Sequence, residues 1–160
     1  MRKLNLSEWA NLAEIVASLV IVASLVYVGL EVNQNTQALQ QTTYQTVQDS
    51  LVELDLTLAT NAEMYRLVSA GETSPDELSE EDWGRFTYFS YPKIAIWEYL
   101  HLAYLEGALS ATQWPAFETY FLSIICKPGN LRFWQENKSG FSSVFNDYMN
   151  TNLASRCGAK

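Results

Sequence analysis

Residues 15 to 30 form an apolar run without a single charge, and Glu14 and Glu31 bound it. With its apolar neighbours on both sides, the run reaches about 20 residues, which is the length of helix that crosses a hydrocarbon core roughly 30 Å thick. We therefore predict one membrane-spanning helix within residues 1–32. This anchor constrains the chain more than any other feature, because the rest of the chain must fold beside a bilayer.

Three other structures could contain the same apolar run. A cleaved signal peptide needs a small-x-small site at a suitable distance, but here the run passes directly into a polar helical stretch. An interfacial helix needs a polar face, which the run lacks. A buried core helix stays open, since residues 15 to 30 lie near the boundary in length between core and membrane helices. Trp9 and Tyr27 favour the membrane helix, because aromatic rings near its ends suit the depth of lipid headgroups.

Small residues share one face of the predicted membrane helix, at Ala10, Ala13, Ala17 and Ser24. In lipid, helices associate through close packing, and small side chains allow the backbones to approach. We therefore expect a helix–helix contact at this face. The alternative is that alanine and serine are common in any such helix.

The distribution of basic residues predicts the orientation of the anchor. Arg2 and Lys3 precede the apolar run, and no lysine or arginine follows it until Arg66. The positive-inside rule therefore places the N-terminus in the cytoplasm and the following domain outside. Cys126 and Cys157 could form a disulfide in such an oxidising compartment, but two free thiols fit a helical domain equally well, so their pairing stays open.

Residues 33–160 predict a small helical bundle, so the fold class is all-α, with one N-terminal membrane helix that continues into the bundle. Apolar residues recur at 3-4-3-4 spacing at Tyr44, Val47, Leu51, Leu54 and Leu58. This stripe predicts an amphipathic helix that reaches about Ala70 and packs in the core of its own chain, with a coiled-coil oligomer as the alternative. Gly71 would cap the helix, and an acidic linker would follow near residues 71–79.

Two later helix starts carry capping signals. Ser79 and Ser110 each have an acidic or amide residue three positions on, which is the spacing of an N-cap and its partner. Between them, residues 83 to 109 are rich in aromatic residues and predict a buried helix that Pro92 kinks or divides. Further helices are predicted at 111–126, 130–138 and 142–153, and no strand pattern or internal repeat competes with this assignment.

The charge of the chain argues against nucleic acid as a partner. The formal net charge is -8 at pH 7, and after residue 3 the lysines and arginines are not clustered as a phosphate-binding surface requires. The charge is also uneven along the chain. Residues 33 to 82 carry ten acids and one base, whereas residues 83 to 160 carry seven bases and five acids, so the membrane-proximal half is the acidic one.

Sequence motifs for catalysis, metal binding or nucleotide binding are absent. His101 is the only histidine, and no cysteine is placed to complete a metal site with it. A di-iron bundle would need Glu-x-x-His twice, whereas the chain has it once, at Glu98 and His101. There is no Gly-x-Ser-x-Gly, phosphate-cradling loop or Cys-x-x-Cys. We expect no catalytic residue, cofactor or metal, and an enzyme that uses Glu98 and His101 ranks third among the interpretations.

Aromatic residues make up 13% of the chain, which is more than a small helical core needs. Exposed tryptophan and tyrosine favour protein interfaces. We therefore expect an interaction surface at Trp114, Phe117 and Tyr120, provided that these side chains are exposed together. The alternative is a sensory or ligand-binding bundle with an apolar pocket at Trp97 and His101.

Two blocks of residues lie near the ends of the chain. The first consists of Trp9, Ala13-Glu14-Ile15, Ser24-Leu25-Val26-Tyr27 and Gln34-Asn35-Thr36, and the second of Pro128-Gly129, Trp134, Phe141, Phe145 and Tyr148. In these blocks the chain resembles a family of short bacterial proteins of unknown function, with one N-terminal membrane helix and a helical domain. The resemblance implies the bacterial inner membrane and supplies no activity.

The chain departs from this family pattern just after the anchor. Such proteins often have basic residues around the Gln-Asn-Thr segment, which would hold the domain in the cytoplasm, whereas Asn33 and Gln37 are uncharged here. The family pattern and the local charge therefore disagree on orientation, and we follow the local charge and expect a periplasmic domain.

Together these features predict a non-enzymatic, membrane-anchored interaction protein. It would be a small accessory or scaffold subunit that assembles with itself or with a larger membrane complex. Its expected partners are the lipid bilayer and protein, either a second copy or another chain, and not nucleic acid.

Overall fold

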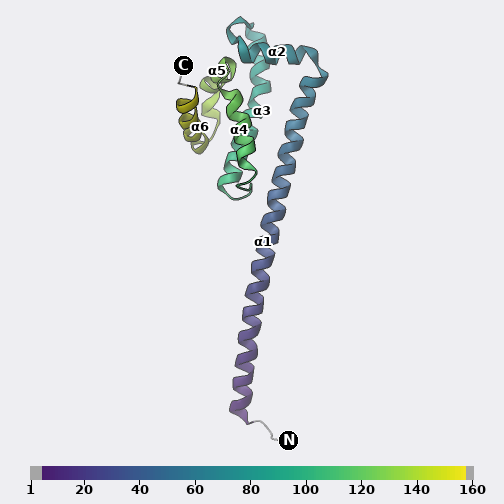
Figure 1. The fold of residues 1–160 in the computed structure, drawn as a ribbon, viewed down its shortest axis with the longest axis vertical. Coiled ribbons are helices and arrows are strands. Elements are labelled where there is room, and N and C mark those ends of the chain that lie inside the picture. Colours follow the sequence, from purple (N-terminus) through teal and green to yellow (C-terminus); the bar gives the residue numbers. More distant parts are fainter. Residues whose placement is uncertain (1–4, 158–160) are drawn as a thin grey trace. The chain divides into compact units, whose positions relative to one another are not determined.

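The computed structural model describes residues 5–157. The regular structure in this range is entirely helical, with no strand, which confirms the all-α prediction (Figure 1). The elements in chain order are α1 Leu6–Thr60, α2 Ala62–Thr73, η1 Pro75–Glu77, α3 Glu80–Leu105, α4 Trp114–Ile125, α5 Pro128–Asn137, η2 Lys138–Gly140 and α6 Ser143–Arg156. The chain divides into two compact units, the first ending at Leu39 and the second beginning at Gln40, so α1 contributes to both.

The first unit is the N-terminal part of α1, and a reciprocal cap fixes its start. The Asn5 side-chain oxygen accepts a hydrogen bond from the Glu8 backbone N–H at 2.9 Å, and the Glu8 carboxylate accepts one from the Asn5 N–H at 2.8 Å. This arrangement is a capping box, in which two backbone donors at the helix start are satisfied by side chains. The helix therefore begins before the apolar run and contains all of it.

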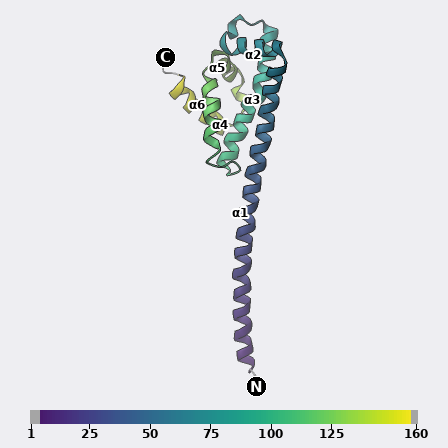
Figure 2. The same cartoon turned by 45° about the vertical axis from the view of Figure 1, so that its right-hand side comes forward.

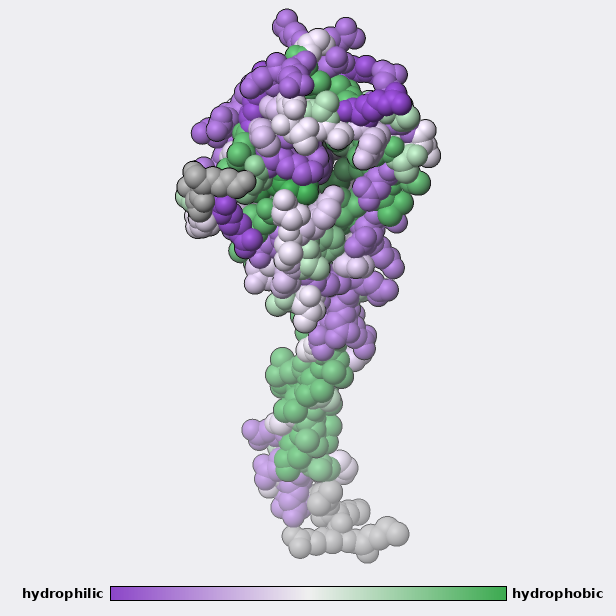
Figure 3. Space-filling model, turned by 45° about the horizontal axis from the view of Figure 1, so that its top comes forward, coloured by the Kyte–Doolittle hydropathy of each residue, from purple (hydrophilic) through white to green (hydrophobic). Residues whose placement is uncertain are grey.

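The apolar run is exposed on every side of α1. An 18-residue window of the helix has a mean hydropathy of 2.4, and none of that window is buried. Figure 3 shows it as a continuous hydrophobic band with hydrophilic residues on either side. Ser18 and Ser24 donate to backbone carbonyls four residues earlier, so their hydroxyls need no outside partner. By length and composition, this helix can cross a membrane.

The second unit begins with the last turns of α1, which end at Thr60 and not near Ala70 as predicted. Asn61 has an extended backbone, and its side-chain oxygen accepts from the N–H groups of Glu63 and Met64, so it caps a new helix, α2. The apolar spacing did not indicate this break, because an N-cap residue can redirect the chain without changing the periodicity around it.

Gly71 does not end a helix as predicted, but lies inside α2, which continues to Thr73. A Cβ atom at Gly71 would lie 2.3 Å from the Phe86 ring, and one at Gly129 of α5 would lie 1.7 Å from the carbonyl oxygen of Gly71. The two glycines therefore allow α2 and α5 to meet backbone to backbone. Residues 71–79, expected as an acidic linker, contain the last turn of α2 and the 3-10 helix η1.

The capping prediction holds at the start of α3. The Ser79 hydroxyl accepts from the Asp82 N–H at 3.1 Å, so Ser79 is the N-cap. Pro92 does not divide α3, which is continuous to Leu105. Because the Pro92 side chain is exposed, its ring does not disturb the packed face of the helix.

The turn between α3 and α4 differs in part from the prediction. The Gln113 side chain accepts from the Ser110 N–H at 3.3 Å and from the Ser110 hydroxyl at 2.8 Å, as the capping signal implies. However, α4 begins only at Trp114, so these contacts close the turn that precedes the helix. Gly107 has a φ of 77° just after α3, a conformation that favours glycine.

The core of the second unit is aromatic. Its largest fully buried side chains are Trp97, Phe86, Phe121, Phe133, Phe145, Leu100, Leu109, Ile125 and Met149. Trp97 stacks on Phe121 with ring centroids 5.1 Å apart, and meets Phe145 edge to face at 5.6 Å. These three residues belong to α3, α4 and α6, so one cluster of rings holds the three helices together.

A disulfide joins the C-terminal ends of α4 and α6. It links Cys126 to Cys157, with Cα atoms 5.4 Å apart, and these are the two cysteines of the sequence. The sequence left this pairing open. In the structure, the bond fixes the end of α6 to the rest of the core.

Breaking this disulfide is expected to lower the free energy of unfolding by about 2–4 kcal/mol, because the bond spans 31 residues and restricts the unfolded chain. The comparison is urea unfolding of the full chain in detergent, followed by tryptophan fluorescence, for the oxidised protein and the Cys126→Ala, Cys157→Ala double variant. Equal unfolding free energies for the two proteins would show that the bond adds no stability.

Candidate functional site: grooves along helix α1

Within the second unit, the later turns of α1 lie beside α3 and α4 (Figure 2) and pack on the core through a narrow row of side chains. Thr43 and Val47 are its buried residues within the described part of the chain, and Leu51 and Leu58 pack against the core while partly exposed. The predicted stripe therefore does pack within its own chain. Because the row is narrow, a groove runs along α1 on each side of it.

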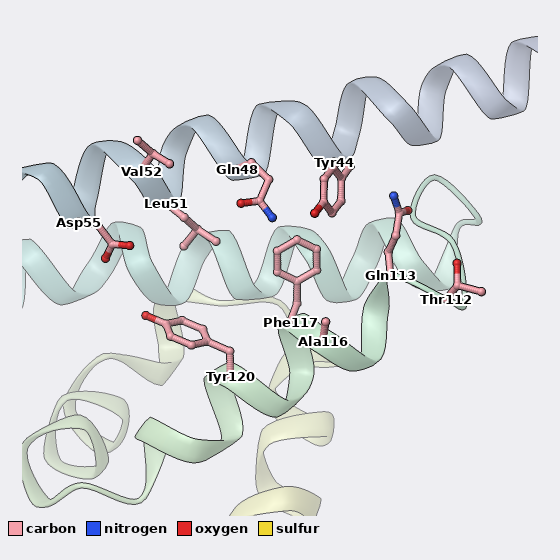
Figure 4. A pocket seen from close by; sticks show the side chains of 10 residues that line it. All are labelled: Tyr44, Gln48, Leu51, Val52, Asp55, Thr112, Gln113, Ala116, Phe117 and Tyr120. Atoms are coloured by element: carbon pink, nitrogen blue, oxygen red, sulfur yellow. The ribbon is translucent and has the colours of Figure 1, made fainter.

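The first groove, here called the α1–α4 groove, has a volume of about 450 Å³. Figure 4 shows the side chains that line it: Tyr44, Gln48, Leu51, Val52, Asp55, Thr112, Gln113, Ala116, Phe117 and Tyr120. The Phe117 ring projects from α4 toward Tyr44, with ring centroids 5.8 Å apart. Gln113 lies near one end and Asp55 near the other, so the groove has an aromatic middle and polar ends.

The predicted interaction surface at Trp114, Phe117 and Tyr120 is wrong as a set. Trp114 and Phe117 are 6% and 7% exposed, whereas Tyr120 is 44% exposed. Trp114 stacks on Tyr104 at 5.4 Å inside the unit. The aromatic content of the chain suggested a surface here, but it could not show that Trp114 and Phe117 face inward. Phe117 and Tyr120 reach the α1–α4 groove, and Trp114 does not.

The second groove, here called the α1–α3 groove, lies between α1 and α3 and has a volume of about 740 Å³. Its lining comprises Thr46, Val47, Ser50, Glu53, Leu54 and Thr57 from α1, and Pro92, Ala95, Ile96 and Tyr99 from α3. The sequence analysis did not identify this groove. Thr46 and Ser50, two small residues four positions apart, mark this face of α1 in the sequence. Their spacing alone does not show which helix lies opposite them.

A third hollow, near α2, holds a cluster of charges around Glu72. The Glu72 carboxylate accepts hydrogen bonds from Lys93 at 3.0 Å and from Lys127 at 2.5 Å, and Asn130 lies 3.5 Å away. Burial opposes ionisation of Glu72, but the two lysines outweigh it, so the pKa of this carboxyl lies below its usual value. The cluster joins α2, α3 and α5, and its single carboxylate is paired with both lysines, which is the pattern of a structural ion-pair network.

Trp97 and His101 line none of these grooves and do not form the apolar pocket that the sequence suggested. Both side chains are buried, and aromatic rings fill the space around them. His101 lies 4.2 Å from the Tyr148 ring and 5.6 Å from the Trp114 ring, measured between centroids. The filled core leaves no room at this place for the ligand-binding alternative.

The polar atoms of this core are only partly satisfied. Within residues 5–157, His101 Nδ1 and Trp97 Nε1 have no hydrogen-bond partner, while the Tyr148 hydroxyl donates to Glu118 at 2.9 Å. Burial raises the pKa of Tyr148 well above its usual value, and the Glu118 carboxylate adds to this effect. Burial lowers the pKa of His101, with Glu118 opposing the shift. The imidazole is therefore neutral in the folded protein near pH 7.

This neutral histidine predicts a loss of stability in acid. In the unfolded chain His101 takes up a proton near pH 6.5, whereas in the folded chain it does so only at lower pH. Below pH 6.5 the unfolded state therefore binds more protons, and the free energy of unfolding falls. We expect the free energy of unfolding, measured with urea, to fall more between pH 7 and pH 5.5 for wild type than for the His101→Phe variant. Equal decreases would contradict the prediction.

Glu98 and His101 have separate surroundings in the structure. The Glu98 carboxylate accepts from the Ser142 N–H at 2.6 Å, next to the start of α6, whereas His101 faces aromatic rings. The described residues contain no group of three or more His, Cys, Asp or Glu side chains placed to hold a metal ion.

No family model, curated protein or solved structure matches this chain. The functional inference therefore rests on its own residues, and the strongest features are the exposed apolar run of α1 and the two grooves beside its later turns.

Proposed function

We propose that this chain is a single-pass protein of the bacterial inner membrane whose helical domain binds another protein, as an accessory or scaffold subunit. The observation that carries the proposal is the apolar run of α1, which is exposed on every side. In water such a surface would be costly, whereas in lipid it is favourable. The same helix continues into a domain whose side chains form two grooves along its later turns.

A periplasmic position for the domain is part of the proposal. The disulfide between Cys126 and Cys157 supports it, because disulfides persist in the periplasm and are rare in the cytoplasm. The charge distribution agrees, since no base lies between the apolar run and Arg66. Arg2 and Lys3, on which the positive-inside argument also depends, lie outside the described residues.

Self-association through the anchor is a second element of the proposal. Ala10, Ala13, Ala17 and Ser24 are all exposed on α1, and the Ser24 hydroxyl is satisfied by the Val20 carbonyl at 2.8 Å. This face therefore combines small side chains with no unsatisfied polar group, which suits close helix packing in lipid.

The test begins with membranes of the native host. After a high-pH carbonate wash, we expect the full chain to stay in the membrane fraction, with an intact mass that includes the apolar run. Release into the soluble fraction, or a mass that lacks the run, would contradict the anchor. A C-terminal alkaline phosphatase fusion is expected to be active, and the matching green fluorescent protein fusion dark. The reverse pattern would place the domain in the cytoplasm.

The second measurement is the native mass of the protein in mild detergent. A stoichiometric foreign subunit would support an accessory role, and a defined homo-oligomer would support self-assembly. A bare monomer at the concentration found in the membrane would contradict the interaction function.

A further inference from the structure

The α1–α3 groove has the dimensions of a helix-binding site. The residues from α1 that line it extend from Thr46 to Thr57, and the eleven steps between these two residues rise about 16 Å, or three turns of helix. Leu54 of α1 and Ile96 of α3 are apolar residues of its lining, and Tyr99 in the same lining is half exposed. A groove between two helices with apolar contacts is the shape that receives a third amphipathic helix.

Two hydroxyl groups in this groove would not oppose an apolar ligand. The Ser50 hydroxyl donates to the Thr46 carbonyl at 3.0 Å, and the Thr57 hydroxyl donates to the Glu53 carbonyl at 3.0 Å. Because these two hydroxyls are satisfied within α1, an apolar ligand that covers them would not leave them without a partner. Ala95 of α3, on the opposite wall, is equally small. Small side chains on both walls allow the backbone of a third helix to come close.

The charge beside the groove has one sign. Glu53 lines it, and Asp49 lies four residues earlier on the same side of α1. Within residues 5–157, neither carboxylate forms an ion pair. A partner helix with lysine or arginine along one edge could therefore form ion pairs with these two carboxylates.

A second copy of α1 is a poor occupant for the same reason. Between the apolar run and Arg66 the chain has no basic residue, while Asp49, Glu53 and Asp55 lie on the later turns of α1. A second α1 seated in this groove would place its own acidic turns against Asp49 and Glu53, and like charges that face each other destabilise such a contact. The charge pattern therefore favours a different chain in this groove.

We propose that the α1–α3 groove binds one amphipathic helix of a partner protein, with an apolar stripe against Leu54 and Ile96 and basic residues beside Asp49 and Glu53. This inference rests on the proposed interaction function and deepens it, because it names the surface and the chemistry of the partner.

The experiment is site-specific photocrosslinking of the full chain in its own membranes. The crosslinking residue p-benzoylphenylalanine replaces Ala95 in the α1–α3 groove or, as a matched control, Ala116 in the α1–α4 groove. We expect an adduct of defined mass from position 95 at a yield several times that from position 116. The crosslinked partner peptide, sequenced by mass spectrometry, should show apolar residues at helical spacing with lysine or arginine beside them.

A charge variant tests the electrostatic half of the proposal. Glu53→Lys is expected to lower the adduct yield from position 95 by about two- to fivefold, as reversal of a charge at the edge of an interface should. Asp147→Lys on α6 changes the net charge equally, lies on an exposed position outside the groove, and should leave the yield unchanged.

Several outcomes would overturn the inference. They are equal yields from positions 95 and 116, no adduct at all, an adduct with a second copy, or a partner peptide that is acidic or lacks helical spacing. If a foreign subunit still accompanies the protein in detergent while the groove yields no adduct, the interaction function stands and the proposed groove does not.

Discussion

Replacing Gly129 by alanine is expected to lower the free energy of unfolding by about 3 kcal/mol or more. The added Cβ would lie 1.7 Å from the carbonyl oxygen of Gly71 and 2.7 Å from its carbonyl carbon. Overpacking of a core usually costs about 1–3 kcal/mol, because side chains can move aside. At Gly129 the added atom would clash with the backbone of Gly71, which cannot move aside without separating α2 from α5. We therefore expect a loss of unfolding free energy at or above the top of that range.

Gly84→Ala is the matched control for this variant. Gly84 lies inside α3, and a Cβ there would have no neighbour within 4 Å. Alanine at such a position should stabilise the protein by about 0.5–1 kcal/mol, since it restricts the unfolded chain. Urea unfolding of the full-length proteins in detergent, followed by tryptophan fluorescence, compares the two variants with wild type. If Gly129→Ala behaves like Gly84→Ala, α2 and α5 do not meet as described.

The second large effect is expected at Trp97. The alanine variant should lower the free energy of unfolding by about 3–5 kcal/mol, because a fully buried indole is lost and a cavity remains. Its ring contacts Phe121, Phe145 and Tyr148 at centroid distances from 5.1 to 5.8 Å, so the loss reaches both α4 and α6.

Phenylalanine at the same position separates packing from polarity. Trp97→Phe keeps an aromatic ring against Phe121 and removes the buried indole N–H, which has no hydrogen-bond partner within the described residues. We therefore expect less than half the destabilisation of Trp97→Ala. A Trp97→Phe variant as unstable as Trp97→Ala would mean that the size of the indole, and not its aromatic contacts, determines the stability of this core.

Some local signals in the sequence predicted local structure correctly. Ser79 was identified as a helix cap from the acidic residue three positions on, and the structure has that hydrogen bond. The 3-4 stripe from Tyr44 to Leu58 predicted which face of α1 packs on the core. These features depend on neighbours within one or two helical turns, so the sequence contains nearly all the information they need.

Features that depend on distant residues were not predictable in this way. The sequence predicts a helix end at Gly71, because glycine is common at helix ends. Glycine is also common where two backbones come close, and only the position of Gly129 shows that Gly71 serves this second purpose. The pairing of Cys126 with Cys157 depends on where α6 ends relative to α4. The same holds for the α1–α3 groove, whose two walls are about 45 residues apart in sequence when Ser50 and Ala95 are compared.

The place of α6 in the core has a consequence for biosynthesis. Phe145 and Met149 are fully buried although they belong to the last helix of the described chain. Until that helix leaves the ribosome, Trp97 and Phe121 lack the rings that cover them, while the apolar run near the N-terminus is already available for membrane insertion. If the apolar run inserts into a membrane as it emerges, the growing chain is tethered before its core is complete, and its unburied rings expose it to aggregation during that interval.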